Sequence, residues 1–180
     1  MNIEQLAHAI RAACNVAEDQ ELYIFGSQAI LGEFPDAPEE LRKSVEVDVV
    51  PVNKPDAVDK IDGALGENSP FHQMHGFYVH GVALETAVLP KGWKERTRVV
   101  RDYLDKNNIG YCVEAHDLAA SKLIAFREKD TEFVRFLILR QMINPTVLHA
   151  RIQLTQVDSV VRQRALTWTE LIIESLSDDD

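Results

Sequence analysis

The chain has 180 residues, of which 46% are apolar and 27% are charged, and its formal net charge is −10. This length supports one substantial hydrophobic core and is short for two, and the composition is that of a globular protein rather than a disordered one. No apolar run approaches the roughly 20 residues that a transmembrane helix requires, and the N-terminus lacks the pattern of a signal peptide. We therefore expect a cytoplasmic protein without a membrane association. The acidic balance excludes a surface that wraps nucleic acid on all sides.

Charge is unevenly distributed along the chain, and cysteine is rare. Residues 1–90 carry 15 acidic and 5 basic side chains, whereas residues 91–180 carry 14 of each. This asymmetry suits a metal site facing a surface that holds a polyanion, but an uneven scatter of solvated charge explains it equally well. Cys14 and Cys112 are the only cysteines. Two thiols make neither a disulfide framework nor a zinc knuckle, so we expect small buried apolar residues in a reducing compartment.

The predicted elements alternate between helix and strand in the first part of the chain. Apolar residues recur at helical spacing over residues 2–18, and a short β-type run follows at residues 22–25. The patterns then predict a helix at 28–34, a loop at 35–38, a strand at 45–50, a helix at 55–65, strands at 77–80 and 82–89, a helix at 99–104 and a strand at 111–113.

The last third of the chain is helical in character. Asn144-Pro145 is predicted to open one helix, as an N-cap followed by a proline at the first position, and a final helix is predicted at 157–176. We therefore expect residues 1–115 to form an α/β core and residues 116–180 to form a helical region packed on it, as one compact structural unit.

Two carboxylates mark the predicted strand at residues 45–50. Successive side chains of a strand point to opposite faces, so Glu46 and Asp48 are predicted to lie side by side, with valines on the other face. Crowded carboxylates repel each other, and a divalent cation such as Mg²⁺ relieves that repulsion. The other interpretation is an edge strand whose polar face meets water, where acidic side chains also hinder aggregation.

A strand-to-helix turn precedes this strand. Gly26-Ser27 ends the run at residues 22–25, and such a turn exposes backbone N–H groups and a hydroxyl that suit a phosphate. Equally, the glycine can supply a positive φ and the serine a helix cap. The Gly-Ser turn and the paired acids are stronger evidence for a functional site together than separately, because they occur in the order strand, Gly-Ser, helix, loop and a strand with paired acids.

Taken together, Phe25-Gly26-Ser27-Gln28-Ala29 and Ser44-Val45-Glu46-Val47-Asp48-Val49 resemble the signature of polymerase-beta-like nucleotidyltransferases. The stretch from His116 to Leu123 resembles a helix of AbiEii/MenA-type toxins, and the resemblance extends to small bacterial relatives without an assigned role. It covers roughly residues 20–135. It implies an α/β fold with a small mixed β-sheet of the nucleotidyltransferase type, flanking helices and a helical C-terminal region.

The resemblance also implies roles for individual residues. Glu46 and Asp48 would bind Mg²⁺, Gly26 and Ser27 would receive the phosphates of an NTP, and Lys122 would face the nucleotide. The first acid is a glutamate where the superfamily usually has an aspartate. The third carboxylate of the superfamily should lie on a nearby strand, and Glu85 is our candidate for this catalytic position. The other interpretations are a solvent-facing strand residue for Glu85 and a snorkelling side chain for Lys122.

Two further clusters carry weaker signals. His72, His75 and His80 lie close together in the sequence and could hold zinc, but no cysteine or carboxylate completes the set locally. We therefore expect a loop with three scattered histidines rather than a zinc site. Trp93 lies among Lys91, Lys94, Arg96, Arg98 and Arg101. This tryptophan either stacks on a base whose phosphates the cations hold, or packs against the body of the domain.

Two functions follow from these patterns. The first is a metal-dependent transfer of an NMP from an NTP to an acceptor, with tRNA as the acceptor and a cognate antitoxin protein as a partner if the toxin resemblance holds. The second is a degenerate nucleotidyltransferase scaffold that binds a nucleotide or a protein and transfers nothing.

Overall fold

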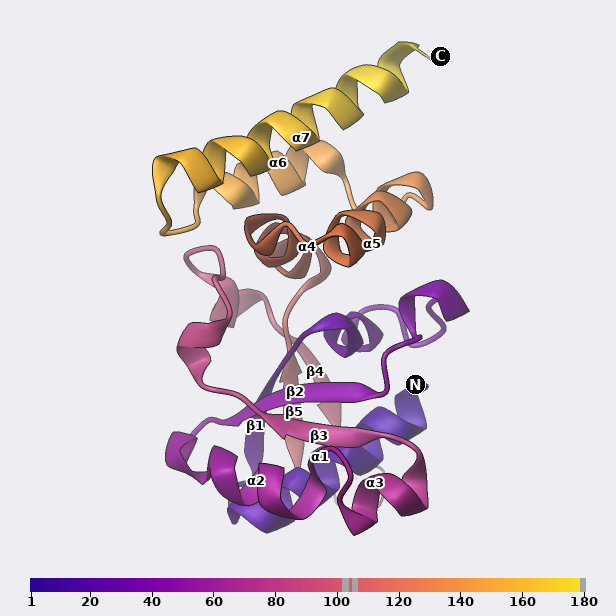
Figure 1. Ribbon diagram of the computed structural model, residues 1–180, viewed down its shortest axis with the longest axis vertical. Helices are drawn as coiled ribbons and strands as arrows, with labels where there is room; N and C mark the ends of the chain where they lie inside the picture. The colour runs from indigo at the N-terminus through magenta and orange to yellow at the C-terminus, as the bar shows by residue number, and fades with distance from the viewer. Residues whose placement is uncertain (102–103, 105–106, 179–180) are drawn as a thin grey trace. The chain divides into compact units, whose positions relative to one another are not determined.

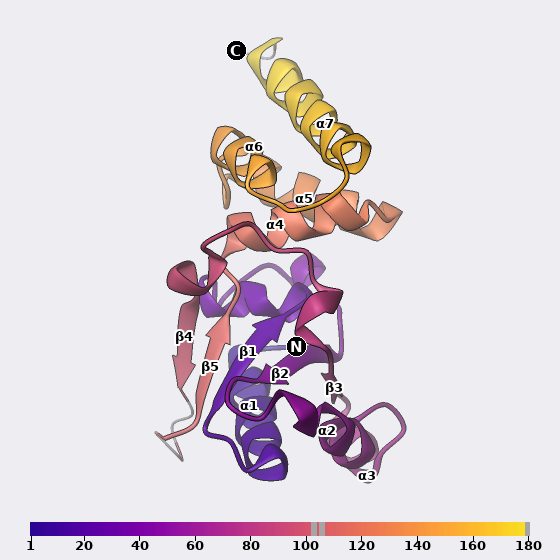
Figure 2. The ribbon, with the colours of Figure 1, turned by 90° about the vertical axis from the view of Figure 1, so that its left-hand side faces the viewer.

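The computed structural model describes residues 1–101, 104 and 107–178, and the chain forms two compact units. Unit 1 comprises Met1–Thr86 and Arg96–Glu114, and unit 2 comprises Ala87–Glu95 and Ala115–Asp180. Figures 1 and 2 label the elements of both units. The expectation that the helical region packs on the α/β core as one compact structure stays a prediction.

Unit 1 holds all the strands of the described part of the chain. Its elements are α1 (Ile3–Ala17), β1 (Glu21–Phe25), η1 (Ser27–Gly32), η2 (Glu39–Leu41), β2 (Glu46–Pro51), η3 (Pro55–Ala57), α2 (Val58–Leu65), α3 (Pro70–His75), β3 (Tyr78–Gly81), η4 (Leu84–Thr86), β4 (Arg98–Arg101) and β5 (Ile109–Cys112), where η marks a 3-10 helix.

The strands of unit 1 form one mixed sheet in the order β3-β2-β1-β5-β4. The inner pair β1 and β2 is antiparallel, and β3 and β5 then add in parallel to β2 and β1 respectively. The outer strand β4 pairs antiparallel with β5. The predicted fold class, a small mixed sheet with flanking helices followed by a helical region, is confirmed.

The two faces of the sheet differ in burial. Val47 and Val49 of β2 are fully buried, whereas Glu46 and Asp48 on the opposite face are partly exposed. Helix α1 covers the buried face, because its Ile10 lies where a Cβ on Gly110 of β5 would project. The apolar stripe of α1 buries Leu6, Ala9, Ile10 and Ala13 together with three further residues, which is the amphipathic pattern expected from the sequence.

Three segments of unit 1 differ from the sequence-based expectation. The predicted strand at 82–89 is wrong, because residues 84–86 form the 3-10 turn η4 and residues 87–95 belong to unit 2. The predicted helix at 99–104 is wrong where the structure describes it, because residues 98–101 form β4, while residues 102–103 lie outside the described residues. Helix α3, which is capped by Ser69, occupies a segment expected to be a loop.

Unit 2 is helical. Its helices are α4 (Ala115–Ala125), α5 (Glu128–Leu139), α6 (Pro145–Gln153) and α7 (Ser159–Asp178), and the 3-10 turn η5 (Trp93–Arg96) begins in its other segment. The Asn144 side chain accepts hydrogen bonds from the amides of Thr146 and Val147 at 2.8 and 3.2 Å, so the predicted cap of α6 is confirmed. Among its fully buried side chains are Leu123, Leu137, Leu148, Ile152 and Ala165.

Both cysteines are buried and neither forms a disulfide, as expected. Burial raises the pKa of the Cys112 thiol to about 12, so this side chain behaves as an apolar core residue. Within the described residues, none of the helices combines the length and the hydrophobicity that a membrane crossing requires.

The loop before β1 is fixed to the loop after β2 by one buried carboxylate. Asp19 accepts hydrogen bonds from the amides of Asn53 and Lys54 at 2.7 and 3.1 Å, and also from the Asn53 side chain and the amide of Glu21. Burial raises the pKa of Asp19, but these hydrogen bonds outweigh it and hold the pKa below its ordinary value. The ionised form is therefore favoured in the folded state.

We expect Asp19→Asn to lower the free energy of unfolding by about 2–3 kcal/mol at about pH 7, because an amide NH₂ replaces an ionised acceptor. A depressed folded-state pKa adds stability that is complete above the ordinary pKa and is lost as the pH falls through the folded-state value. The difference between wild type and variant in urea unfolding should therefore shrink towards about pH 3. Asp59→Asn, at an exposed position on α2, is the control. A difference that is unchanged at low pH would contradict this account.

Candidate active site

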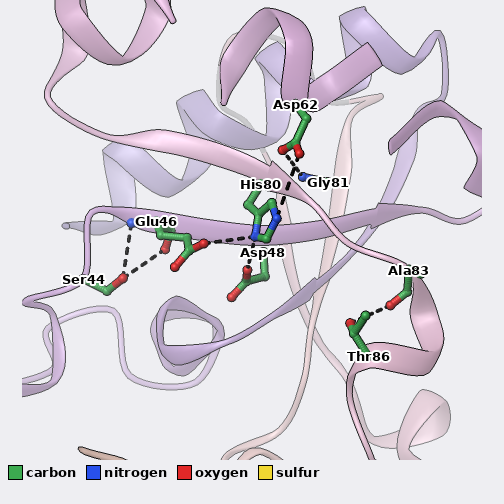
Figure 3. A network of polar contacts seen from close by, with 8 residues as sticks. All are labelled: Ser44, Glu46, Asp48, Asp62, His80, Gly81, Ala83 and Thr86. Atoms are coloured by element: carbon green, nitrogen blue, oxygen red, sulfur yellow. Dashed lines mark hydrogen bonds and ion pairs between the residues drawn. The ribbon is translucent and has the colours of Figure 1, made fainter. Parts of the chain in front are cut away.

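The paired acids of β2 lie opposite two polar residues of β3. In the register of the sheet, Glu46 faces Tyr78 and Asp48 faces His80. Paired residues of neighbouring strands share a face, so all four side chains lie on the face of the sheet away from α1. The expectation that Glu46 and Asp48 share one face is confirmed, because His80 contacts both of them (Figure 3).

The His80 imidazole lies between the two carboxylates. Its Nδ1 atom is 3.0 Å from Glu46 Oε1 and 3.2 Å from Asp48 Oδ1. Its other nitrogen, Nε2, lies 4.0 Å from Asp62 Oδ2, and the second oxygen of Asp62 accepts a hydrogen bond from the Gly81 amide at 3.0 Å. Helix α2 thereby supplies a third carboxylate, which fixes the end of β3 and orients the ring from the far side (Figure 3).

The electrostatics of the site favour a charged imidazole. Partial burial lowers the pKa of His80, but the charge of Asp62, the hydrogen bond with Asp48 and the charges of Asp48 and Glu46 outweigh this effect, so the pKa lies above its ordinary value. Burial and the charge of Glu46 also raise the pKa of Tyr78, whose hydroxyl forms a hydrogen bond with Glu46. The carboxylates of β2 thus favour the protonated forms of His80 and Tyr78.

The turn after β1 lies against Asp48. Gly26 has φ +63° and ψ −170°, a region that is essentially restricted to glycine. A Cβ at this position would lie far inside 3.0 Å of Asp48 Oδ2, a distance that real Cβ atoms essentially never reach. The glycine is therefore required both for its backbone conformation and for the room that it leaves to the carboxylate.

The 3-10 helix η1 is attached to the start of β2. Ser27 opens η1, and the buried Gln28 donates a hydrogen bond to the carbonyl of Ser44 at 2.8 Å. The Ser44 hydroxyl in turn accepts a hydrogen bond from the Glu46 amide at 3.2 Å. The Gly-Ser turn and the paired acids, which the sequence separates by a loop, are thus held together by strand pairing and by side-chain hydrogen bonds.

Comparison with known protein families identifies the family of the chain. The model of the family described as "Nucleotidyltransferase of unknown function (DUF6036)" matches residues 2–175. The chain belongs to this nucleotidyltransferase family. No curated protein and no solved structure matches it.

The donor set of this nucleotidyltransferase fits a divalent cation. Within the described residues, one atom each of Glu46, Asp48 and His80 forms a group in which all atoms lie within 4.8 Å of one another. Adjacent ligands of an octahedral ion with bonds of about 2.1 Å lie about 3.0 Å apart. The separations from His80 Nδ1 to the two carboxylates, 3.0 and 3.2 Å, match that spacing and equally match N–H···O hydrogen bonds. The site can therefore hold a proton or a metal ion between the same atoms.

Within the described residues, the predicted residues Glu85 and Lys122 do not belong to this group of donor atoms. Glu85 lies exposed on the turn η4, which the Thr86 hydroxyl closes by donating to Ala83 at 2.7 Å (Figure 3). It is not part of the group formed by Glu46, Asp48 and His80. Its catalytic role stays a prediction, whereas the strand that was expected to carry it does not form.

Lys122 belongs to unit 2, where it is almost fully buried on α4. Its ammonium group lies 3.2 Å from Asp130 and 4.5 Å from the ring centroid of Phe133. Arg127 contacts the same carboxylate at 2.6 Å. The side chain therefore forms a buried ion pair instead of snorkelling to solvent, and its role at the nucleotide stays a prediction.

The two weaker clusters separate in the structure. His72 accepts a hydrogen bond from the Asn68 amide, and His75 packs edge-on against His8, so within the described residues only His80 of the three belongs to a metal-type group. Arg98, on β4, pairs with Glu33 at 2.9 Å and belongs to unit 1, whereas Trp93 belongs to unit 2.

We expect Gly26→Ala to lower the free energy of unfolding by about 2–4 kcal/mol, because the methyl group would overlap Asp48 and the backbone would be strained. Gly63→Ala in α2 is the matched control, since nothing lies within 4 Å of a Cβ there. This control should raise stability by about 0.5–1 kcal/mol. Urea unfolding of both variants provides the comparison. If Gly26→Ala were as stable as wild type, the close approach of Asp48 would be excluded.

Proposed function

We propose that this protein transfers a nucleoside monophosphate from an NTP to an acceptor hydroxyl, using a divalent cation held by Glu46, Asp48 and His80. The acceptor oxygen forms a bond to the α-phosphorus, and the bond from that phosphorus to the bridging oxygen breaks. Pyrophosphate leaves, and the hydroxyl proton passes to a base. The cation would supply charge stabilisation for the phosphate oxygens when bound.

One observation carries this proposal: two carboxylates and an imidazole converge beside a Gly-Ser turn in a member of a nucleotidyltransferase family. Glu46 and Asp48 offer the hard oxygen ligands that Mg²⁺ prefers, and His80 adds one nitrogen. The backbone at Gly26 and the hydroxyl of Ser27 are proposed to receive the β- and γ-phosphates. Strand pairing fixes these groups relative to one another, which is what catalysis by positioning requires.

The base and the second nucleotide contact belong to the proposal as well. Glu85 remains the candidate that orients or deprotonates the acceptor, since it lies on the turn five residues after His80. Lys122 remains a candidate phosphate contact. Its buried pairing with Asp130 means that a nucleotide would have to offer the ammonium group at least as good a partner.

The acceptor and the partners rest on resemblance. The helix that contains His116–Leu123 is similar to that of AbiEii/MenA-type toxins, so we propose tRNA as the acceptor and a cognate antitoxin protein as a partner.

The other candidate function is a scaffold that binds nucleotide without transfer. His80 favours this alternative, because an imidazole pairs with Asp48 across the neighbouring strands and can neutralise the acids by itself.

Incubation with each of the four NTPs labelled at the α-phosphate, together with cellular RNA and Mg²⁺ or Mn²⁺, tests the transfer. We expect label in the RNA with wild type, and a loss of about 100-fold or more with Asp48→Asn, because a direct ligand is removed. The exposed control Asp59→Asn should keep full activity.

The same variants separate transfer from binding alone. Nucleotide at a hundredfold over its Kd should stabilise wild type by about 2.7 kcal/mol. If such stabilisation occurs with a metal ion but no label is transferred to RNA or protein, the chain is a binding scaffold. Undiminished transfer by Asp48→Asn would refute the metal role of this residue.

His80 should set the metal preference, because Mn²⁺ accepts an imidazole ligand more readily than Mg²⁺ does. We expect the ratio of the Mg²⁺ Kd to the Mn²⁺ Kd to fall about tenfold in His80→Asp, whose three carboxylates suit Mg²⁺ better. Calorimetric titration of both ions at one fixed pH measures this ratio, with Asp59→Asn again as the control. An unchanged ratio would mean that His80 does not bind the ion.

A further inference from the structure

A groove of about 430 Å³ lies entirely within unit 2, away from the residues of the proposed metal centre in the chain. It is formed by the segment Leu89–Glu95 together with Gln156, and Trp93, Lys91 and Lys94 contribute to its lining. This volume falls within the range of pockets that bind small organic groups.

The groove presents an aromatic ring with cations beside it. The ammonium group of Lys94 lies 5.7 Å from the ring centroid of Trp93, within the distance at which a cation and an indole attract each other. Trp93 is partly exposed, and Lys91 and Lys94 are exposed. The Gln156 amide, also exposed, offers both a donor and an acceptor at the rim, while Glu95 contributes one negative charge.

The backbone of the groove is held in place. The Lys91 amide donates to the carbonyl of Leu154 at 3.0 Å, which ties the segment to the end of α6, and the Trp93 amide donates to Pro90 at 3.1 Å. Between them, Gly92 adopts φ +80°, so the chain turns there. A fixed turn keeps Trp93 and the two lysines close together, which reduces the entropy lost when a ligand binds.

The distribution of charge makes unit 2 less repulsive to a polyanion than unit 1. Unit 1 carries 18 acidic and 9 basic side chains, a net charge of −9, whereas unit 2 carries 11 and 10, a net charge of −1. A nucleic acid is therefore repelled much less by unit 2. Planar base and anionic phosphate are the two chemical features that a tryptophan flanked by lysines recognises together.

We propose that the groove around Trp93 binds a single-stranded nucleic acid, with one base stacked on the indole and the adjoining phosphates held by Lys91 and Lys94. Single strands are favoured because a base within a duplex already stacks on its neighbours and does not offer a face. This inference rests on the proposed function in one respect: it identifies the acceptor of the proposed NMP transfer as a nucleic acid. Binding of the strand requires neither metal ion nor NTP.

Two single-tryptophan variants test the stacking, because the chain has only two tryptophans. In Trp168→Phe the remaining indole is Trp93, and in Trp93→Phe it is Trp168. We expect oligouridylate and oligothymidylate, added in EDTA without NTP, to quench the fluorescence of Trp93 and to leave that of Trp168 unchanged. A duplex of equal length should quench neither. Quenching of both tryptophans or of neither would overturn the proposal.

The lysines are tested by affinity and salt dependence. Two phosphate contacts on a single strand predict a slope of about −1.4 in a plot of log K against log salt. Changing Lys91 and Lys94 together to glutamine should weaken binding about tenfold and bring the slope towards zero, while Lys60→Gln, an exposed lysine of α2, should change neither. Trp93→Ala should also cost about tenfold, with melting curves to verify the fold.

Comparison of different competitors and oligonucleotides identifies the ligand. Tighter binding of oligouridylate than of oligothymidylate assigns the groove to RNA, and the reverse assigns it to DNA. If UMP binds as tightly as the oligonucleotide, or if polyglutamate displaces the strand completely, the groove is not a strand site and the proposal fails. Quenching without label transfer would support strand binding at the groove and contradict the proposed transferase function. Label transfer to RNA without quenching would support the transferase function and contradict strand binding at the groove.

Discussion

Unit 1 is organised around the repulsion between Glu46 and Asp48, which share one face of β2. Two carboxylates this close are stable together only with positive charge between them. The charges of Asp62, Asp48 and Glu46 raise the pKa of His80 against the effect of burial and so favour a charged imidazole there. Its Nδ1 atom lies 3.0 and 3.2 Å from the two acids of β2, and Asp62 lies on the other side of the ring. Because His80 comes from β3, the balance of charge depends on the register that pairs it with Asp48. A slip of one residue would turn His80 to the core face and leave both acids without their partner.

The same strand sets the conformation of the turn beside it. Phe25 pairs with Asp48, so the chain that leaves β1 must pass directly over the carboxylate, and only a glycine at position 26 leaves room for it. Gln28 then attaches η1 to Ser44, at the entrance of β2. The proposed phosphate-binding turn and two of the proposed metal ligands, Glu46 and Asp48, are thus placed relative to each other by the pairing of β1 with β2. A site built on paired strands holds its geometry better than one carried by loops alone.

Local patterns in the sequence predicted the part of this site that depends on local geometry. The period of two along residues 45–50 placed Glu46 and Asp48 on one face, and Gly-Ser after a strand indicated the turn. His80 was grouped with His72 and His75 instead, because its position opposite Asp48 follows from the pairing of two strands that α2 separates in the sequence. The strand expected at 82–89 fails for a related reason. Asp62 accepts a hydrogen bond from the Gly81 amide, and a Cβ on Gly81 would collide with the backbone of Val58. These contacts with α2 mark the end of β3, although the alternation of apolar residues continues in the sequence.

The charge of unit 1 constrains how a nucleotide can reach this centre. A net charge of −9 repels a free triphosphate, and the three carboxylates around His80 add to this repulsion at short range. A divalent ion reduces both sources of repulsion, because it neutralises the acids and lowers the negative charge of the triphosphate that it accompanies. Entry as a metal complex is therefore favoured over entry of the bare nucleotide. One imidazole bridges Glu46 and Asp48, but even its protonated form would not offset three carboxylates and a triphosphate. If the proposed nucleotide binds at this face, we therefore expect it to need the cation even before any chemistry takes place.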